Sequence, residues 1–356
     1  MHMCEAFADN GVDVELVIPK RFSISDIGKK DPFKYYGIKK IFRIKKIFCF
    51  DLTPLNKYLG PISFLTEALS FAFFASIYLL FKKTDIIFSR DRFSLFFIAP
   101  FKKNVIIEAH QLHRSLFKFI LKKVKKIIVI TDGLKNDLIK KGINESKILV
   151  APDGVDLKMF DVQCSKLEAR EKLNLPSDKK IVLYTGHLYK WKGVETLALA
   201  SQYLDENTMV VIAGGIKWYL DDFKKFIEKS SLKNILVLGH QDYAKMPYFL
   251  KSADCLVLTG TKNSETSNKH TSPIKMFEYM ASKEPIVASN LPSFGEVLNA
   301  NNAILIESDS PEAMAKGIKK ALEDKEFSAK ISQRAYQDVQ KYNWDNRAKS
   351  ILKFIK

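Results

Sequence analysis

Cysteine is scarce in this chain, with four residues among 356 and no C-x-x-C pair. A disulfide framework or a zinc site needs paired or regularly spaced thiols, so the sequence argues against both. Histidine offers no metal site either, because His110 and His113 are three residues apart but no cluster of carboxylates or thiols joins them. Glu5 and Asp9 interrupt the first apolar stretch, so we expect no signal peptide and a cytoplasmic chain.

Nucleic-acid-binding motifs are also missing, although the net charge is +17. Residues 1–150 carry 27 Lys/Arg against 14 Asp/Glu, whereas the remaining residues carry 30 against 26. A basic half of this kind predicts a polyanion or an anionic membrane surface as partner. No helix-turn-helix, RNP or zinc-finger pattern supports nucleic acid, so none is expected. Peripheral docking at the inner face of the cell membrane stays open.

Long apolar runs are few, and one stretch approaches the length of a membrane span. Residues 61–81 contain a single charge, Glu67, which together with Ser63, Thr66, Ser70 and Ser76 dilutes the apolar run. A partly buried domain helix is the preferred interpretation, with a membrane-surface helix and a true span as alternatives. Further along, Arg114, Lys118 and Lys122 recur every four residues, which fits either a solvated helix face or docking on a membrane.

Short apolar runs alternate with helix-like stretches along the whole chain, which is the pattern of βα units and parallel sheets. We therefore predict an α/β protein of two Rossmann-like, doubly wound domains. The expected domains are residues 1–160 and 170–340, followed by a terminal helix over 341–356 that returns to the first domain. The expected strands are 12–19, 38–44, 85–89, 104–108, 126–131, 147–151, 180–185, 209–213, 235–239, 255–259, 285–288 and 303–306.

The most informative motif runs from Ser272 to Ala281 and has the sequence S-P-I-K-M-F-E-Y-M-A. We expect Ser272 to cap a helix that begins at Pro273. The N–H groups at such a helix start suit a diphosphate or a sugar hydroxyl. Glu278, about two turns in, could accept two hydrogen bonds from a ribose. The alternative for Glu278 is an ordinary surface glutamate.

A second motif follows a predicted strand and opens a helix, with the sequence G-H-L-Y-K-W-K-G over residues 186–193. Gly186 allows close approach of the backbone to a ligand, and Lys192 places a cation where a diphosphate would lie. A glycine-rich loop with a lysine is weak evidence alone, but its order and separation from the Glu278 motif strengthen it.

These two motifs resemble the donor-binding segments of the GT-B glycosyltransferases, specifically the large retaining family 4. The resemblance implies that Glu278 holds the nucleotide ribose, that Lys192 neutralises the leaving nucleoside diphosphate, and that His187 stands near the basic residue many members have there. The fuller family pattern has a second glutamate eight residues before Glu278, where this chain has His270. His270 is therefore a candidate catalytic residue, expected to be neutral because a cation would oppose a developing oxocarbenium ion.

Smaller matches occur in the same order as in the family. Gly239 and His240 open a stretch that resembles the backbone receptor of the base, and Ala213-Gly214-Gly215 resembles the preceding strand end. His110 follows a strand and corresponds to a histidine that faces the reacting sugar or the acceptor in many relatives. The alternative for His110 is a histidine whose hydrogen bonds are satisfied at a strand end. Asn343 to Arg347 resembles the start of the terminal helix.

The resemblance leaves one gap, because the chain opens directly on a helix-like segment. We expect the first strand and glycine loop of the first domain to be missing. The function implied is retaining transfer of a sugar from a UDP- or GDP-sugar to a glycan or lipid-linked acceptor in cell-envelope synthesis, with no cofactor and no metal. The alternatives are an impaired, non-catalytic sugar-nucleotide-binding protein and a sugar-nucleotide epimerase.

Overall fold

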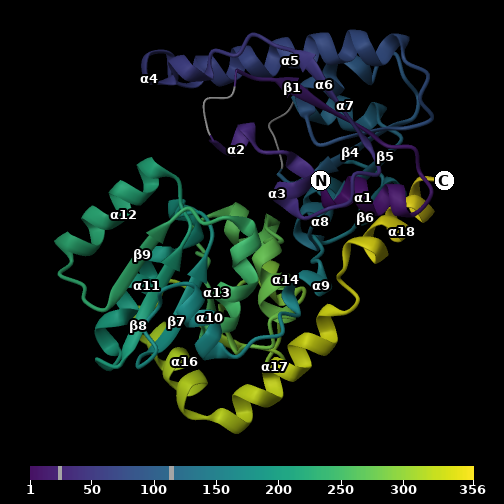
Figure 1. Cartoon of the computed structure of the whole chain (residues 1–356). Coiled ribbons are helices and arrows are strands. Elements are labelled where there is room, and N and C mark those ends of the chain that lie inside the picture. The colour runs from purple at the N-terminus through teal and green to yellow at the C-terminus, as the bar shows by residue number, and fades with distance from the viewer. Residues whose placement is uncertain (23–25, 112–115) are drawn as a thin grey trace. The chain divides into compact units, whose positions relative to one another are not determined.

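The computed structural model describes residues 1–22, 26–111 and 116–356. The chain divides into two compact units, one of residues 1–151 with 345–356 and one of residues 152–344 (Figure 1). His113 and Arg114 lie outside the described residues, as does the side chain of Lys118.

The first unit begins with a helix, as expected, and the six strands among its described residues form two parallel sheets. One sheet has the order β1-β2 and the other the order β3-β4-β5-β6. The elements are α1 (His2–Asp9), β1 (Glu15–Lys20), α2 (Asp26–Lys29), α3 (Pro32–Tyr36), β2 (Arg43–Phe48), α4 (Asn56–Leu59), α5 (Pro61–Phe81), β3 (Ile87–Ser89), α6 (Arg92–Ile98), β4 (Val105–Ala109), α7 (Leu116–Lys123), β5 (Lys126–Val129), α8 (Asp132–Lys140), β6 (Ile148–Val150) and α18 (Trp344–Ile355).

The second expected strand was misplaced by about five residues. Residues 38–42 instead lie outside regular secondary structure, and Ile38 and Phe42 pack into a small cluster with Phe33. Strand β2 carries Arg43, Lys45 and Lys46 among its six residues, so it does not appear in the sequence as an apolar run. Pairing with β1 overrides that local signal.

The second unit is one parallel sheet of six strands in the order β12-β11-β10-β7-β8-β9. Its strands agree with the expected ranges to within one residue at nearly every end. The elements are α9 (Leu157–Phe160), α10 (Lys166–Lys172), β7 (Lys180–Thr185), α11 (Val194–Ala200), β8 (Thr208–Ala213), α12 (Lys217–Lys229), β9 (Ile235–Gly239), α13 (Met246–Ser252), β10 (Cys255–Leu258), α14 (Ile274–Ala281), β11 (Ile286–Ser289), α15 (Pro292–Gly295), β12 (Ile304–Ile306), α16 (Pro311–Glu323) and α17 (Lys325–Val339).

Helices cover both faces of this sheet, so the unit is doubly wound as predicted. Along β7 the buried side chains alternate between two cores, with Leu183 in the core under α13 and α14 and Tyr184 in the core under α11 and α16. Because both faces are covered, the strands are continuous runs of apolar residues and not alternating ones.

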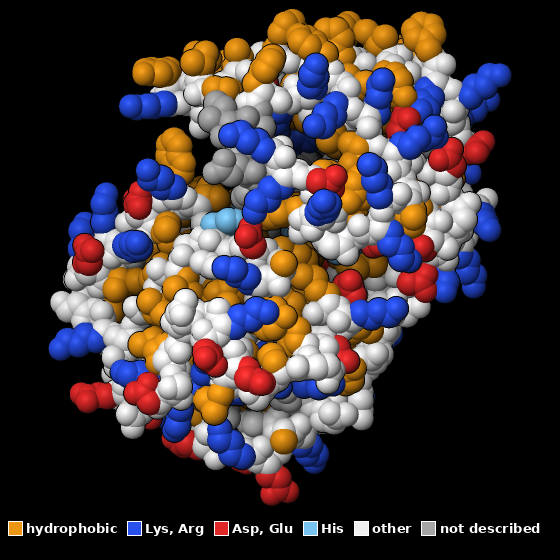
Figure 2. All heavy atoms as spheres, in the orientation of Figure 1, with side chains coloured by type: hydrophobic (Ala, Val, Ile, Leu, Met, Phe, Trp, Pro, Cys, Tyr) orange, Lys and Arg blue, Asp and Glu red, His pale blue; other side chains and the backbone are white. Residues whose placement is uncertain are grey.

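Helix α5 has the bounds that the sequence predicted but an unusual exposure. Among the described residues it is the helix that is long and apolar enough to cross a membrane, and 22% of its most apolar window is buried. Figure 2 shows hydrophobic side chains along α5 at the top of the view, with Lys and Arg side chains beside them.

Candidate functional site

The two sequence motifs of the second unit meet where its strand order reverses. Strand β7 pairs with β8 on one side and with β10 on the other, although β10 comes three strands later in the chain. At such a switch point the loops leave the carboxyl ends of adjacent strands in opposite directions and open a crevice for ligands. The loop after β7 holds Gly186 to Lys192, and the loop after β10 leads to α14.

Glycines shape the carboxyl ends of three neighbouring strands. Gly186, Gly214 and Gly239 follow or end β7, β8 and β9, and all three have positive φ. A Cβ added at Gly214 would lie 2.3 Å from the carbonyl oxygen of Gly186, so a side chain there would displace the loop after β7. His187 and His240, which follow two of these glycines, are exposed.

Lys192 ends a short turn that is fixed from both sides. Thr259, just after β10, donates a hydrogen bond from Oγ1 to the Lys192 carbonyl oxygen at 2.6 Å. Gly193 has φ +67°, and a Cβ there would lie 3.1 Å from the Gly260 backbone. Burial lowers the pKa of Lys192 to about 8, because the ammonium loses hydration without gaining an acidic neighbour among the described residues.

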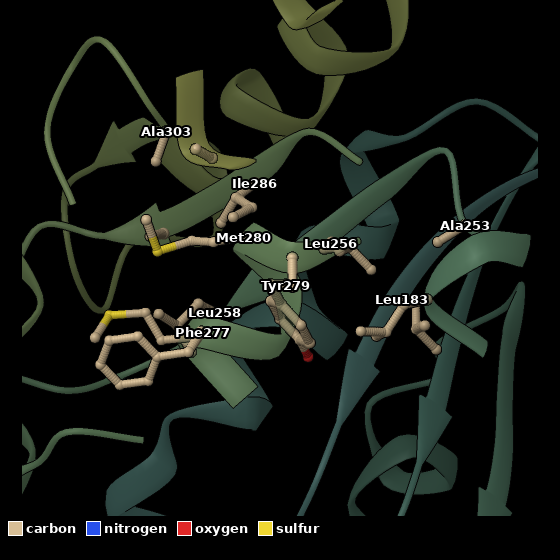
Figure 3. Packing of buried hydrophobic residues seen from close by; sticks show 14 of the residues in the cluster. Leu183, Ala253, Leu256, Leu258, Phe277, Tyr279, Met280, Ile286 and Ala303 are labelled. Carbon is tan, nitrogen blue, oxygen red and sulfur yellow. The ribbon is translucent and has the colours of Figure 1, made fainter. Parts of the chain in front are cut away.

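Helix α14 packs onto the sheet through buried side chains. Phe277, Tyr279 and Met280 are buried. Figure 3 shows them beside residues of the strands, among them Leu256 and Leu258 of β10. This packing gives α14 a defined position relative to the strand ends.

Glu278 is buried, so the interpretation as an ordinary surface glutamate was wrong. Burial raises the pKa of Glu278 to about 7, although a hydrogen bond from Tyr243 and the charge of Lys275 act in the opposite direction. The Tyr243 hydroxyl donates to Oε1 of Glu278 at 2.8 Å. Tyr243 belongs to the stretch after Gly239, so the two segments matched to base and ribose binding are in contact.

Lys275 was not predicted from the sequence, yet it lies next to two residues that were, Lys192 and Pro273. The Nζ atom of Lys275 donates to the Thr185 carbonyl oxygen at 3.0 Å and lies 3.6 Å from the centroid of the Tyr184 ring. Burial, together with the charge of Lys192, holds the pKa of Lys275 well below its usual range. Lys192, Pro273 and Lys275 line one small pocket. The signal was present in the S-P-I-K segment, but a lysine on a helix is usually exposed.

Ser272 does not cap α14, so that expectation was wrong. The helix begins at Ile274, and Pro273 occupies the cap position with extended backbone and no side-chain hydrogen bond. The Ser272 Oγ atom is buried and has no hydrogen-bond partner among the described residues. Burying a hydroxyl without a hydrogen-bond partner costs free energy, which suggests that a bound ligand supplies the missing partner of Ser272.

His270 lies in a π-helical turn, Thr266–His270, that precedes α14. Its side chain is buried, and the turn is fastened by Ser293, whose Oγ donates to the Ser267 carbonyl oxygen at 2.7 Å. His270 therefore lies on the same loop as Ser272 and Pro273. The neutral His270 ring expected from the sequence stays a prediction.

His110 belongs to the first unit and comes directly after β4. Its Nε2 atom lies 2.7 Å from Oε1 of Glu108, so in the neutral ring Nε2 carries the proton and Nδ1 the lone pair. Burial alone would raise the pKa of Glu108, but His110 together with Arg347 and Arg90 holds it well below the usual range. Arg347, on α18, donates to Glu108 and to the Ala151 carbonyl oxygen.

A larger hollow of about 550 Å³ lies elsewhere on the second unit, beside α16. It is lined by residues of both charge signs, including Glu312, Lys316 and Glu323, and none of the motif residues contributes to it. Its size alone carries no chemistry.

Comparison with known proteins identifies the family of both halves. Residues 165–338 match the family profile described as glycosyl transferases group 1, and residues 1–159 match glycosyltransferase family 4. An uncharacterized glycosyltransferase of Methanocaldococcus jannaschii is 28% identical over 241 residues, which cover 65% of this chain and 60% of that protein. The matches span 60%, 61% and 50% of the length of three curated relatives.

Solved structures show the same fold at low sequence identity. The Anabaena protein HepE, solved with UDP and glucose, has a TM-score of 0.75 and 15% identity, with 99% of this chain and 94% of that chain covered. WaaG, a glycosyltransferase involved in lipopolysaccharide biosynthesis, has a TM-score of 0.71 and 14% identity, with 100% and 94% covered.

Proposed function

The chain belongs to the GT-B glycosyltransferases of family 4, and from that premise we propose that it moves a sugar from a nucleotide-sugar donor to an acceptor hydroxyl with retention of configuration. The observation that carries the proposal is the arrangement around α14. Two lysines, Lys192 and Lys275, and the unpartnered hydroxyl of Ser272 accompany a buried carboxylate, Glu278, that a ribose could bind.

The donor side of the reaction follows from these groups. When the bond between the anomeric carbon and the diphosphate oxygen breaks, the electron pair passes to that oxygen, and Lys192 and Lys275 stabilise the charge that develops. The first N–H groups of α14 and the Ser272 hydroxyl add hydrogen-bond donors. We assign ribose binding to Glu278, base contacts to the stretch from Gly239, and the sugar side to His270.

The acceptor hydroxyl forms the new bond to the anomeric carbon and loses its proton. We propose that the acceptor hydroxyl attacks from the face that the diphosphate leaves, so that its proton passes to the departing diphosphate oxygen. UDP is the preferred nucleotide because the Anabaena relative was solved with it, and GDP remains the alternative. The fold relative WaaG supports a cell-envelope glycan or glycolipid as acceptor. We propose in addition that the reaction takes place in the cytoplasm.

The direct test presents UDP-, GDP- and ADP-sugars together with a panel of glycan and lipid-linked acceptors. We expect one donor to raise the melting temperature, to release its nucleoside diphosphate and to yield a product whose anomeric proton shows the donor's configuration by NMR. An inverted product would contradict retention. A changed sugar that stays attached to its nucleotide would favour the epimerase, and binding without release in any combination would favour the non-catalytic protein.

The affinity for UDP should pass through a maximum between about pH 7 and about pH 8. Below about pH 7 Glu278 is protonated and can no longer accept two ribose hydroxyl groups, whereas above about pH 8 Lys192 is neutral and attracts the diphosphate less. We expect roughly tenfold weaker binding per pH unit outside these limits, measured by calorimetry.

Uridine is the matched control, since it has the ribose but no diphosphate. Its affinity should fall on the acid side in the same way and should not respond to the titration of Lys192. A dissociation constant for UDP that stays constant from about pH 6 to about pH 9 would show that neither group contacts the nucleotide.

A further inference from the structure

Helix α5 has the reverse of the polarity expected for a helix on a water-soluble protein. Its buried residues are small or polar, namely Ser63, Glu67, Ala72, Ala75 and Ser76. A surface helix normally turns its apolar stripe to the core and its polar face to water. Here many of the large apolar side chains are exposed, although Leu79 and Leu80 pack against the core of the unit.

These exposed side chains form one continuous stripe along the helix. Successive members are three or four residues apart, which places them on one face over a length of roughly 30 Å. Their exposed fractions run from 39% to 87%. The stripe comprises Ile62, Leu65, Leu69, Phe73, Ile77 and Phe81.

Polar contacts on the buried face hold α5 in this orientation. Ser76 donates from Oγ to the Ser94 carbonyl oxygen at 3.3 Å, and the Phe50 backbone N–H donates to Ser70 Oγ at 2.9 Å. Glu67, which is almost fully buried, pairs with Arg21. Turning the stripe inward would break these contacts and leave buried polar groups without partners.

Aromatic residues of neighbouring segments widen the apolar surface. Phe48 and Phe50, at the end of β2, are 48% and 54% exposed, and the Phe48 ring lies 5.4 Å from that of Phe74 on α5. On the other side, the rings of Phe73 and Phe97 are 6.2 Å apart, and Phe96 beside it is 47% exposed. An apolar patch of this extent usually marks an interaction site.

Cations flank the patch at both ends. Lys57 precedes α5 and Lys83 follows it, and both are exposed. The Nζ atoms of Lys45 and Lys82 lie 5.7 Å and 5.2 Å from the centroid of the Tyr78 ring near the end of the helix. An apolar stripe bordered by lysines is the pattern of a helix that lies in the interface of an anionic bilayer.

We propose that α5 docks the protein on an anionic lipid surface, with the stripe at the boundary of the acyl chains and the flanking lysines among the headgroups. A second copy of the chain is a poorer occupant, because residues 1–150 carry 27 Lys/Arg against 14 Asp/Glu and would repel their own kind. A span is also a poorer solution, since Glu67, Ser70 and Ser76 would leave the partners that hold them.

The proposal goes beyond the proposed function and does not depend on it, because a chain without transferase activity would dock in the same way. The test is co-sedimentation of the full chain with phosphatidylcholine vesicles and with vesicles that contain about one third phosphatidylglycerol, at low and high salt. We compare the wild type with the double variant Leu69→Glu/Phe73→Glu. The matched control is Leu167→Glu on α10, where the leucine is 61% exposed.

The wild type and Leu167→Glu should bind the anionic vesicles at low salt, and the double variant should bind at least about tenfold more weakly with an unchanged melting temperature. No binding of the wild type at low salt would overturn the proposal, as would equal loss in both variants. Binding that resists alkaline carbonate extraction would show a span instead. A wild-type dimer that the double variant turns into monomers, without vesicle binding, would assign the stripe to a second copy.

Discussion

Replacing Lys192 with alanine is expected to lower kcat/KM for the nucleotide sugar by roughly 10²- to 10³-fold, the loss that follows removal of one preorganised group opposite a developing charge. The effect should be large because Lys192 is desolvated and held by its turn: its carbonyl oxygen accepts from Thr259, and Gly193 abuts the Gly260 backbone. Neighbouring Lys275 should compensate only in part, since it already donates one Nζ hydrogen to the Thr185 carbonyl oxygen.

The matched control is Lys190→Ala, which removes an exposed cation two residues earlier in the same turn. Lys190→Ala changes the net charge by the same amount as Lys192→Ala, but it leaves intact the pocket lined by Lys192, Pro273 and Lys275. The turnover of the Lys190→Ala variant should therefore stay within about threefold of the wild type. Release of nucleoside diphosphate in steady state measures both variants. Equal losses would mean that the general field of the loop, and not contact with Lys192, stabilises the leaving group.

Removing the Glu108 carboxylate is expected to destabilise the first unit by about 3–5 kcal/mol, the usual cost of leaving one partner of a buried ion pair alone. In Glu108→Ala the guanidinium of Arg347, whose side chain is 3% exposed, would lose both of its hydrogen bonds to the carboxylate. Urea unfolding at neutral pH measures the loss.

A second variant and the pH dependence of stability test whether the loss comes from the buried ion pair. Arg90→Ala removes a partner of the same carboxylate that is 52% exposed, so we expect a loss below about 1 kcal/mol. Because the folded pKa of Glu108 lies far below its usual value, the stability it contributes is present above about pH 4.5 and fades as the pH falls further. The variant should therefore lose this acid dependence, and a variant that kept it would place the effect elsewhere.

Local patterns in the sequence were sufficient for the second unit. Its strands are covered on both faces and therefore appear as continuous apolar runs, so β7 and β9 have the predicted bounds. The predicted Gly186 and Gly239 lie at the carboxyl ends of those strands, and Lys192 lies in the loop after β7, where topology brings loop residues together. In the first unit, β2 was misplaced because it is rich in lysine and arginine and is held by pairing with β1.

The sequence by itself determined the class of fold and the family, and it predicted the donor-side motifs, because these depend on periodicity and on residues close together in the chain. Only the tertiary structure decided which groups touch. Tyr243 meets Glu278 across 35 positions, and Arg347 meets Glu108 across 239. The tertiary structure also decided the orientation of α5, whose composition allowed a core helix, a surface helix or a span. Contacts with distant partners, among them Ser94 and Arg21, turned its apolar face outward.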